Sequence, residues 1–233
     1  MTPMLGAGVS AAAPATISGC SGLPTATGSS GCLARETFDG ATSCYSGFTS
    51  NCDQTWSYAT GDLVFNYTTA PAPLQGTNSL YIPAGFGSKG YFSVTTSGTM
   101  YAGAMVRVSS LPVQSNNIFV IESTADTPLC TIQFYGTDTI NMLNAGGTTQ
   151  ATTLSLSDST TFYIKVKAVK GTGADASCTP YYSSNGTSWT EGTASTNGTW
   201  TANPAWFFPN GTNSGPNIVM DDVRLSTSDF NYW

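Results

Sequence analysis

Short runs of alternating apolar and polar residues follow one another from residue 33 almost to the end of the chain. Alternation with a period of two places one set of side chains on a buried face and the other on an open face of a strand. The runs are rich in Val, Ile, Tyr, Phe and Thr, and Gly, Asn, Asp and Pro separate them. They lie at 33–38, 54–59, 62–68, 78–83, 90–96, 99–110, 116–123, 129–136, 139–145, 152–157, 161–171, 178–192, 204–209 and 217–226. The pattern predicts an all-β fold of antiparallel strands, either a sandwich or a barrel.

The segment 161–171 shows the alternation most clearly. One face would carry Phe162, Ile164, Val166 and Ala168, and the other Tyr163, Lys165, Lys167 and Val169. We expect the lysines to form a solvated face rather than a binding patch. The dipeptide Asn185-Gly186 is the strongest short signal for a hairpin turn and predicts one within 178–192.

Residues 1–31 differ from the rest, because they are rich in Gly, Ala, Ser, Pro and Thr and show no periodicity. We interpret them as an extended N-terminal arm for assembly or anchoring, and residues 32–233 as one β domain. The first residues have neither the basic start nor the apolar segment of a signal peptide. We therefore expect either a signal that has been removed or release by another route, such as lysis.

Charge is scarce: only 9% of the 233 residues are charged, and the formal net charge is −6. Seven scattered cations do not favour binding to nucleic acid through phosphate neutralisation. No apolar run approaches the roughly 20 residues needed to span a membrane.

Six cysteines, an even number, indicate an oxidising destination. Loop length and strand adjacency favour the pairs Cys20–Cys32, Cys44–Cys52 and Cys130–Cys178, although free thiols remain an alternative. A zinc site is not expected, because the chain has no Cys-x2-Cys pair and no histidine.

Four segments in order give the chain a family resemblance. These are "RETFDG" at 35–40, "GTNSLYIP" at 76–83, "TFYIKVKAVKG" followed by "YYSSNGTSW", and "IVMDDVRLS" at 218–226. Together they resemble the concanavalin A-like, laminin-G-like jelly roll. The resemblance implies an antiparallel β-sandwich whose first and last strands lie near each other, and it says little about function.

The adjacent carboxylates Asp221 and Asp222 lie in the last of these segments, where alternation requires one of them to face inward. The resemblance would bring Glu36 and Asp39 close to them. One hypothesis is a structural calcium site of Glu36, Asp39 and Asp222, since hard cations favour oxygen clusters. The alternative is that Asp222 accepts backbone hydrogen bonds or pairs with an arginine: Arg35, Arg107 or Arg224.

Enzymatic activity is not expected. Without histidine there is no Ser-His-Asp triad and no His base. The only glutamates are Glu36, Glu122 and Glu191, and none stands in the paired pattern of retaining glucanases of this fold. A polysaccharide lyase or glycoside hydrolase is the less favoured possibility, because a lyase acting on uronates also needs nearby cations. We expect no required cofactor.

Binding is the remaining class of function, and aromatic side chains in turns are the candidates for contacting a glycan. The candidates are Tyr181, Tyr182, Trp189, Trp200 and Trp206. We expect Trp200, between small residues, to be a loop aromatic, whereas core packing is the alternative for most of the others.

Two biological settings fit these features. The first is a non-enzymatic virion surface protein of a tailed bacteriophage, for head decoration or tail association. It would contact other virion proteins or copies of itself through the arm, and possibly polysaccharide. The second is a secreted bacterial carbohydrate-binding module or adhesin. Neither setting involves nucleic acid or membrane insertion.

Overall fold

The computed structural model describes residues 32–39, 42–43, 50–52, 58–60, 64–67, 73–83, 89–93, 96, 98–110, 116–123, 127–135, 139–145, 149–153, 157–204, 206–209 and 216–230. These residues form strands, turns and bends and contain no helix, so none of their elements is a helix that could cross a membrane. The all-β class predicted from the sequence is confirmed. The expected arm, residues 1–31, lies outside the described residues.

The larger sheet has nine strands, all paired antiparallel to their neighbours. Its main order is β15 (Thr190–Glu191), β14 (Gly171–Ser183), β13 (Thr161–Val169), β8 (Met100–Val108), β18 (Ile218–Ser226), β6 (Ser79–Ile82) and β5 (Val64–Tyr67). Two further strands join this sheet beside the main order: β1 (Cys32–Glu36) pairs with β18, and β16 (Ser195–Trp200) pairs with β14.

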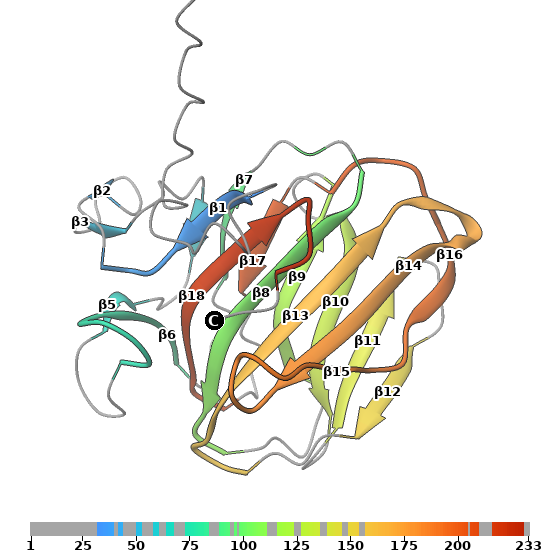
Figure 1. Ribbon diagram of the computed structural model, residues 1–233. Coiled ribbons are helices and arrows are strands. Elements are labelled where there is room, and N and C mark those ends of the chain that lie inside the picture. Colours follow the sequence, from blue (N-terminus) through green and yellow to red (C-terminus); the bar gives the residue numbers. More distant parts are fainter. Residues whose placement is uncertain are drawn as a thin grey trace, which may run out of the picture.

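The second sheet has seven strands in the order β12 (Gln150–Thr153), β11 (Thr139–Asn144), β10 (Pro128–Tyr135), β9 (Asn116–Glu122), β17 (Trp206–Pro209), β7 (Lys89–Ser93) and β4 (Tyr58–Thr60). A separate pair is formed by β2 (Thr42–Ser43) and β3 (Ser50–Cys52). The two large sheets stack as the layers of a sandwich, with β13 and β14 in front of β9 to β12 in the view of Figure 1.

Apolar side chains from both sheets fill the space between the layers. Phe134 of β10 meets Phe162 of β13 edge to face, with ring centroids 5.6 Å apart. Aromatic pairs prefer this arrangement, and it adds to the free energy gained from burying the rings. A disulfide between Cys130 of β10 and Cys178 of β14 also joins the layers, with the two Cα atoms 5.7 Å apart. This bond matches the pairing expected for these two cysteines.

The chain's first described strand and its last large strand are neighbours. β1 pairs with β18, with Glu36 opposite Val223, which confirms the expected adjacency. The alternation expected along β18 is wrong, however, because every residue of this strand is buried. A bulge between Asp221 and Arg224 interrupts the register against β8, and Asp222 has a φ of 41°. The extra residue of a bulge changes which way the following side chains point, so both carboxylates can be buried.

Trp200 is not the exposed loop aromatic that the sequence predicts. Residues 195–200 form β16, and Trp200 is only 6% exposed. Its indole Nε1 donates a hydrogen bond of 3.0 Å to Oδ1 of the buried Asn144 on the opposite sheet. A Cβ on Gly198 would lie 2.0 Å from that same oxygen, so only glycine allows Asn144 to approach β16 this closely. The small residues around Trp200 therefore indicate close packing and not a loop.

Candidate functional site

A pocket of about 360 Å³ lies where β13, β14 and β15 meet two connecting segments. The lining residues are Ser157, Thr160, Thr161, Phe162, Tyr182, Ser183, Ser184, Ser188 and Thr190, and we call this site the hydroxyl pocket. Every lining residue except Phe162 carries a hydroxyl group, and none carries a charge at neutral pH. The volume lies within the range of small-molecule sites in proteins, about 300–1,000 Å³.

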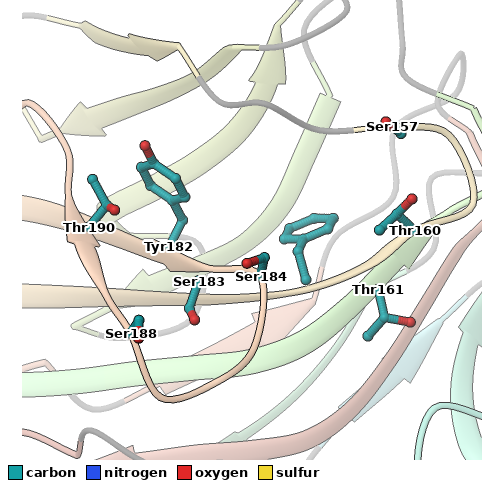
Figure 2. A pocket seen from close by; sticks show the side chains of 9 residues that line it. Ser157, Thr160, Thr161, Tyr182, Ser183, Ser184, Ser188 and Thr190 are labelled. Carbon is teal, nitrogen blue, oxygen red and sulfur yellow. The ribbon is translucent and has the colours of Figure 1, made fainter.

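Strand register places Tyr182 at the centre of this arrangement. Tyr182 is opposite Ile164 of β13 and Thr190 of β15, and its ring packs against the hydrophobic core. Figure 2 shows the side chains of Tyr182, Thr190 and Thr160 extending to one side of the strands, whereas those of Ser183 and Thr161 extend to the other. An aromatic ring is thus partly exposed among hydroxyl groups.

The turn after β14 is held by its own side chains. The hydroxyl of Ser183 accepts hydrogen bonds from the backbone N–H groups of Asn185 and Gly186, at 3.2 and 2.9 Å. Oδ1 of Asn185 in turn accepts from the backbone N–H groups of Thr187 and Ser188. Gly186 has a φ of 73°, which glycine adopts without steric cost. The turn predicted from Asn185-Gly186 is confirmed, and its bonds fix the wall that contains Ser184 and Ser188.

The segment before β13 forms another wall and is anchored to β8. The backbone N–H of Ser159 donates to the carbonyl oxygen of Val108 at 2.9 Å, and that of Thr160 donates to the carbonyl oxygen of Ser157 at 3.3 Å. Ser159 has a φ of 58°, an uncommon value for a residue with a side chain. Ser157 and Thr160 are exposed on this fixed turn, so their hydroxyls are presented in defined positions.

The other two aromatic candidates of this hairpin, Tyr181 and Trp189, are not among the residues that line the pocket. Tyr181 and Trp189 contact Lys165 of β13, whose Nζ lies 4.9 and 4.5 Å from the two ring centroids. The ring of Phe230 is 5.5 Å from the same nitrogen. The expected solvated position of Lys165 is wrong, because its side chain is 1% exposed. Tyr181 and Tyr182 point in different directions because neighbouring residues of a strand face opposite sides: Tyr181 is opposite Lys165, and Tyr182 is opposite Ile164.

Asp229 completes this second arrangement, which we call the Lys165 cluster: Lys165, Tyr181, Trp189, Asp229 and Phe230. Nζ of Lys165 lies 2.5 Å from Oδ1 of Asp229 and donates to the backbone carbonyl oxygen of Phe230 at 3.0 Å. Burial lowers the pKa of Lys165, and the bond and charge of Asp229 oppose that shift. Burial, followed by the charge of Glu191, raises the pKa of Tyr181 to about 12. The cluster attaches the segment after β18 to the outer face of the sheet.

Trp206, the last aromatic candidate, belongs to β17, where it is opposite Ser93 of β7 and Glu122 of β9. Its side chain lies outside the described part of the structure. Among the aromatic candidates whose side chains are described, only Tyr182 lines the hydroxyl pocket. The other lining side chains were not predicted, because serine and threonine are abundant along the whole chain and show no spacing that singles these out.

The carboxylates predicted to hold calcium each have other partners. Asp222 forms ion pairs with Arg35 at 2.6 Å and Arg224 at 2.5 Å, so two of the three arginine alternatives are realised. Burial would raise the pKa of Asp222, but hydrogen bonds and charges from the two arginines outweigh it and hold the pKa below its usual value. Glu36 accepts a hydrogen bond of 2.8 Å from the backbone N–H of Phe38.

Asp39 binds a turn instead of joining Asp222. Its Oδ1 accepts hydrogen bonds from the backbone N–H groups of Thr77 and Asn78, at 3.0 and 2.9 Å. Gly76, with a φ of 60°, has no room for a Cβ beside this carboxylate. Across the described residues, no three acidic, cysteine or histidine side chains gather as metal ligands would. The structure thus does not bring Glu36, Asp39 and Asp222 together as a site.

Asp221 is buried beside this ion-pair network and accepts hydrogen bonds from neutral groups. Its Oδ2 accepts from the hydroxyl of Ser79 at 2.8 Å and from the backbone N–H of Gln75 at 3.0 Å. Burial raises the pKa of Asp221 to about 8, although these bonds and one from the N–H of Asp222 oppose the shift. We read this group as structural, because it joins β18 to β6 at 0% exposure.

The cysteines other than the intersheet pair are only partly described. Cys32 is disulfide-bonded. Cys20 and Cys44 lie outside the described residues, so the pairs Cys20–Cys32 and Cys44–Cys52 stay predictions.

Comparison with known proteins places this fold among β-sandwich domains. No protein-family profile matches the sequence, and no curated protein matches it. Solved structures do match. The endo-β-1,4-glucuronan lyase of the fungus Trichoderma reesei has a TM-score of 0.52 at 12% identity, with 74% of this chain and 91% of the lyase covered.

Two further structures match a larger share of this chain but only part of their own. The receptor-binding domain of botulinum neurotoxin type G has a TM-score of 0.56 at 10% identity, over 87% of this chain and 49% of that one. The Trypanosoma rangeli sialidase, solved with sialic acid, has a TM-score of 0.60 at 12% identity, over 90% and 32%. At such identities the likeness shows the fold, an antiparallel β-sandwich.

Proposed function

We propose that the chain is a non-enzymatic glycan-binding domain and that the hydroxyl pocket is its binding site. The observation that carries this proposal is the lining itself: a half-buried tyrosine ring beside serine and threonine hydroxyls. A sugar presents C–H groups on one face and hydroxyls around its edge. An aromatic ring packs against the first, while side-chain hydroxyls both donate to and accept from the second.

The structural neighbours support the same class of ligand. A glucuronan lyase and a sialidase are named for their action on glycans, and the sialidase was solved with sialic acid. The fold alone hosts many functions. The pocket chemistry is therefore the stronger support, and the neighbours add that sandwiches of this fold occur in glycan-active proteins.

Binding is favoured over turnover by the positions of the acidic groups. General acid–base cleavage of a glycan needs two carboxyl groups flanking the bond. None of the residues that line the hydroxyl pocket is a carboxylate, and the buried Asp221 and Asp222 are engaged with other groups. The sequence also has no histidine to serve as a base.

The test is a glycan array screened with the full chain, followed by titration of the strongest glycan into the wild type and into Tyr182→Ala. We expect loss of the ring to weaken binding by about 10-fold to 100-fold, roughly 1.4–2.8 kcal/mol. Tyr135→Ala is the matched control, because Tyr135 is 52% exposed and lies on β10, away from the pocket lining. Unchanged affinity of Tyr182→Ala would contradict the assigned site, and steady release of shortened glycan would contradict the non-enzymatic role.

For the biological setting we propose the surface of a tailed bacteriophage virion, in head decoration or tail association, with a secreted bacterial module or adhesin as the alternative. Support for the virion comes from the composition of residues 1–31, which suits an arm that lies against a neighbouring subunit. The Cys130–Cys178 disulfide fits either setting, because such bonds persist in oxidising surroundings.

An oligomer measurement separates the two settings. If residues 1–31 are an assembly arm, the full chain should form a symmetric oligomer or attach to a virion shell, and a chain lacking them should do so more weakly. A full chain that stays monomeric and ignores phage shells would favour the secreted alternative.

A further inference from the structure

The charges around the hydroxyl pocket restrict the kind of glycan that it can hold. An acidic sugar carries a carboxylate, which proteins bind with arginine or lysine or with an array of backbone N–H groups. None of the pocket-lining residues is a cation. The chain has seven cations in total, so few are available to approach the site.

Five of the seven cations have contacts elsewhere, and Arg107 of β8 is opposite the lining residue Thr161, whose side chain extends away from Tyr182. Lys165 is on β13, yet its Nζ is held by Asp229 within the Lys165 cluster. Lys170 donates to Oδ1 of Asn203 at 2.7 Å, and Nζ of Lys167 lies 5.9 Å from the ring centroid of Tyr101. Arg35 and Arg224 are paired with Asp222.

Negative charge, in contrast, lies next to the pocket in the sequence. Asp158 is exposed between the lining residues Ser157 and Thr160. With a formal net charge of −6 for the whole chain, the field near the pocket opposes an anionic ligand. Interactions of this kind act over about 8–10 Å at ordinary ionic strength, which includes the neighbours of a lining residue.

We propose that the hydroxyl pocket selects uncharged glycans, made of neutral sugars, and discriminates against sialylated and uronate-containing ones. This inference rests on the proposed function. The pocket favours a neutral sugar in two ways. Hydroxyl groups form hydrogen bonds with the edge of the sugar, whereas a carboxylate beside the Tyr182 ring would lose water without gaining a cation. Specificity then comes from the lack of a partner for charge as much as from the contacts that are made.

The experiment uses the full chain and pairs of soluble oligosaccharides that differ only in charge. Suitable pairs are lactose with sialyllactose, and β-1,4-linked glucose oligomers with β-1,4-linked glucuronate oligomers of equal length. We expect the neutral member of a pair to bind at least about 10-fold more tightly than the acidic one. Its affinity should not change with salt, while residual binding of the acidic member should improve as salt screens repulsion.

A charge added to the pocket sharpens the test. Thr190→Lys places a cation in the lining and should reduce the preference for the neutral member at least several-fold. Thr172→Lys is the matched control, because Thr172 is exposed on β14 but does not line the pocket, and it should leave the preference unchanged. Both variants carry the same net charge, so a difference between them reports the position of the lysine.

The outcomes separate this inference from the proposed function. Tight binding of acidic glycans by the wild type, or equal binding of both members of a pair, would overturn the selection for neutral sugars while leaving glycan binding in place. No binding to any glycan by a folded protein would overturn the proposed function itself and this inference with it.

Discussion

The Lys165 cluster and the hydroxyl pocket occupy the same two strands and the same hairpin, yet they treat polar groups in opposite ways. In the cluster, a charge is buried and fully engaged: Asp229 pairs with Lys165, and three aromatic rings surround the nitrogen. In the pocket, neutral hydroxyls remain beside an open volume of about 360 Å³. The polar groups of the cluster bond to one another, whereas those of the pocket line an open volume that we propose holds a glycan.

Adjacent residues produce this difference. Tyr181 and Tyr182 are neighbours on β14, and the strand directs them to opposite faces. Tyr181 meets a lysine already paired with an aspartate, so its ring serves stability. Tyr182 meets hydroxyl-bearing residues, and we propose that its ring packs against a sugar. The identity of a residue type therefore does not decide its role here; the face that it occupies does.

The largest effect that we expect is on the pH dependence of the unfolding free energy, and it comes from Asp221, a buried carboxyl group of β18. The folded protein holds the Asp221 proton up to about pH 8, whereas the unfolded chain releases it near the usual value of 3.8. The contribution of this group is therefore fully present below pH 3.8 and is lost as pH rises toward about 8. The loss should amount to a few kcal/mol of unfolding free energy.

Asp221→Asn cannot ionise and should remove this dependence. Denaturant unfolding at several pH values between about 4 and 8 should give a flatter profile for the variant than for the wild type. Asp222→Asn is the comparison, since the pKa of Asp222 is lowered and its contribution is instead lost as pH falls through that lowered value. Parallel profiles for wild type and Asp221→Asn would contradict the assigned burial of a protonated group.

The next largest effect is the loss of stability when a substitution breaks the Lys165 cluster. Asp229→Ala leaves a buried ammonium without its carboxylate, which we expect to cost about 1–3 kcal/mol of unfolding free energy, since Asp229 itself is 41% exposed. Lys165→Met in the same chain removes the buried charge and should recover most of that loss. A double-mutant cycle over the two positions measures the coupling. Additive losses would show that the pair does not interact in the folded state.

A smaller effect separates the two tyrosines directly. Tyr181→Ala should lower the unfolding free energy by about 1–2 kcal/mol through the lost contact with Lys165, and it should leave glycan affinity within about twofold. Tyr182→Ala, in contrast, should weaken glycan binding by about 10-fold to 100-fold. Thermal unfolding and titration of both variants give the two readouts. If both variants lost affinity equally, the division of roles between the faces of β14 would be wrong.

Sequence reasoning was most successful where local chemistry decides the structure. The alternation in 161–171 gives β13 with the expected core face, and Asn185-Gly186 gives the expected turn. It failed where a distant segment decides. No residue near Lys165 in the sequence indicates that the segment 227–230 covers its side chain. Likewise, the burial of Trp200 depends on Asn144, which is 56 residues away in the sequence.

The carboxylates of β18 and the residues of the hydroxyl pocket illustrate two further limits of prediction from the sequence. Alternation predicts that only one of Asp221 and Asp222 faces inward, and a bulge removes that constraint. The pocket draws its hydroxyls from a turn, three strands and a hairpin, so no local run of residues defines it. Tyr182 could be selected as an aromatic candidate, but its partners become visible only when the fold brings Thr160 and Thr190 to the same side of the strands (Figure 2).

The most direct test of glycan binding at the hydroxyl pocket is amide chemical-shift mapping of the full chain during titration with a neutral oligosaccharide that binds it. The account predicts that the shifted amides cluster at residues 157–162 and 182–190, with the amides around Asp229 and Phe230 unaffected. Shifts centred on the Lys165 cluster, or on strands remote from Tyr182, would contradict it.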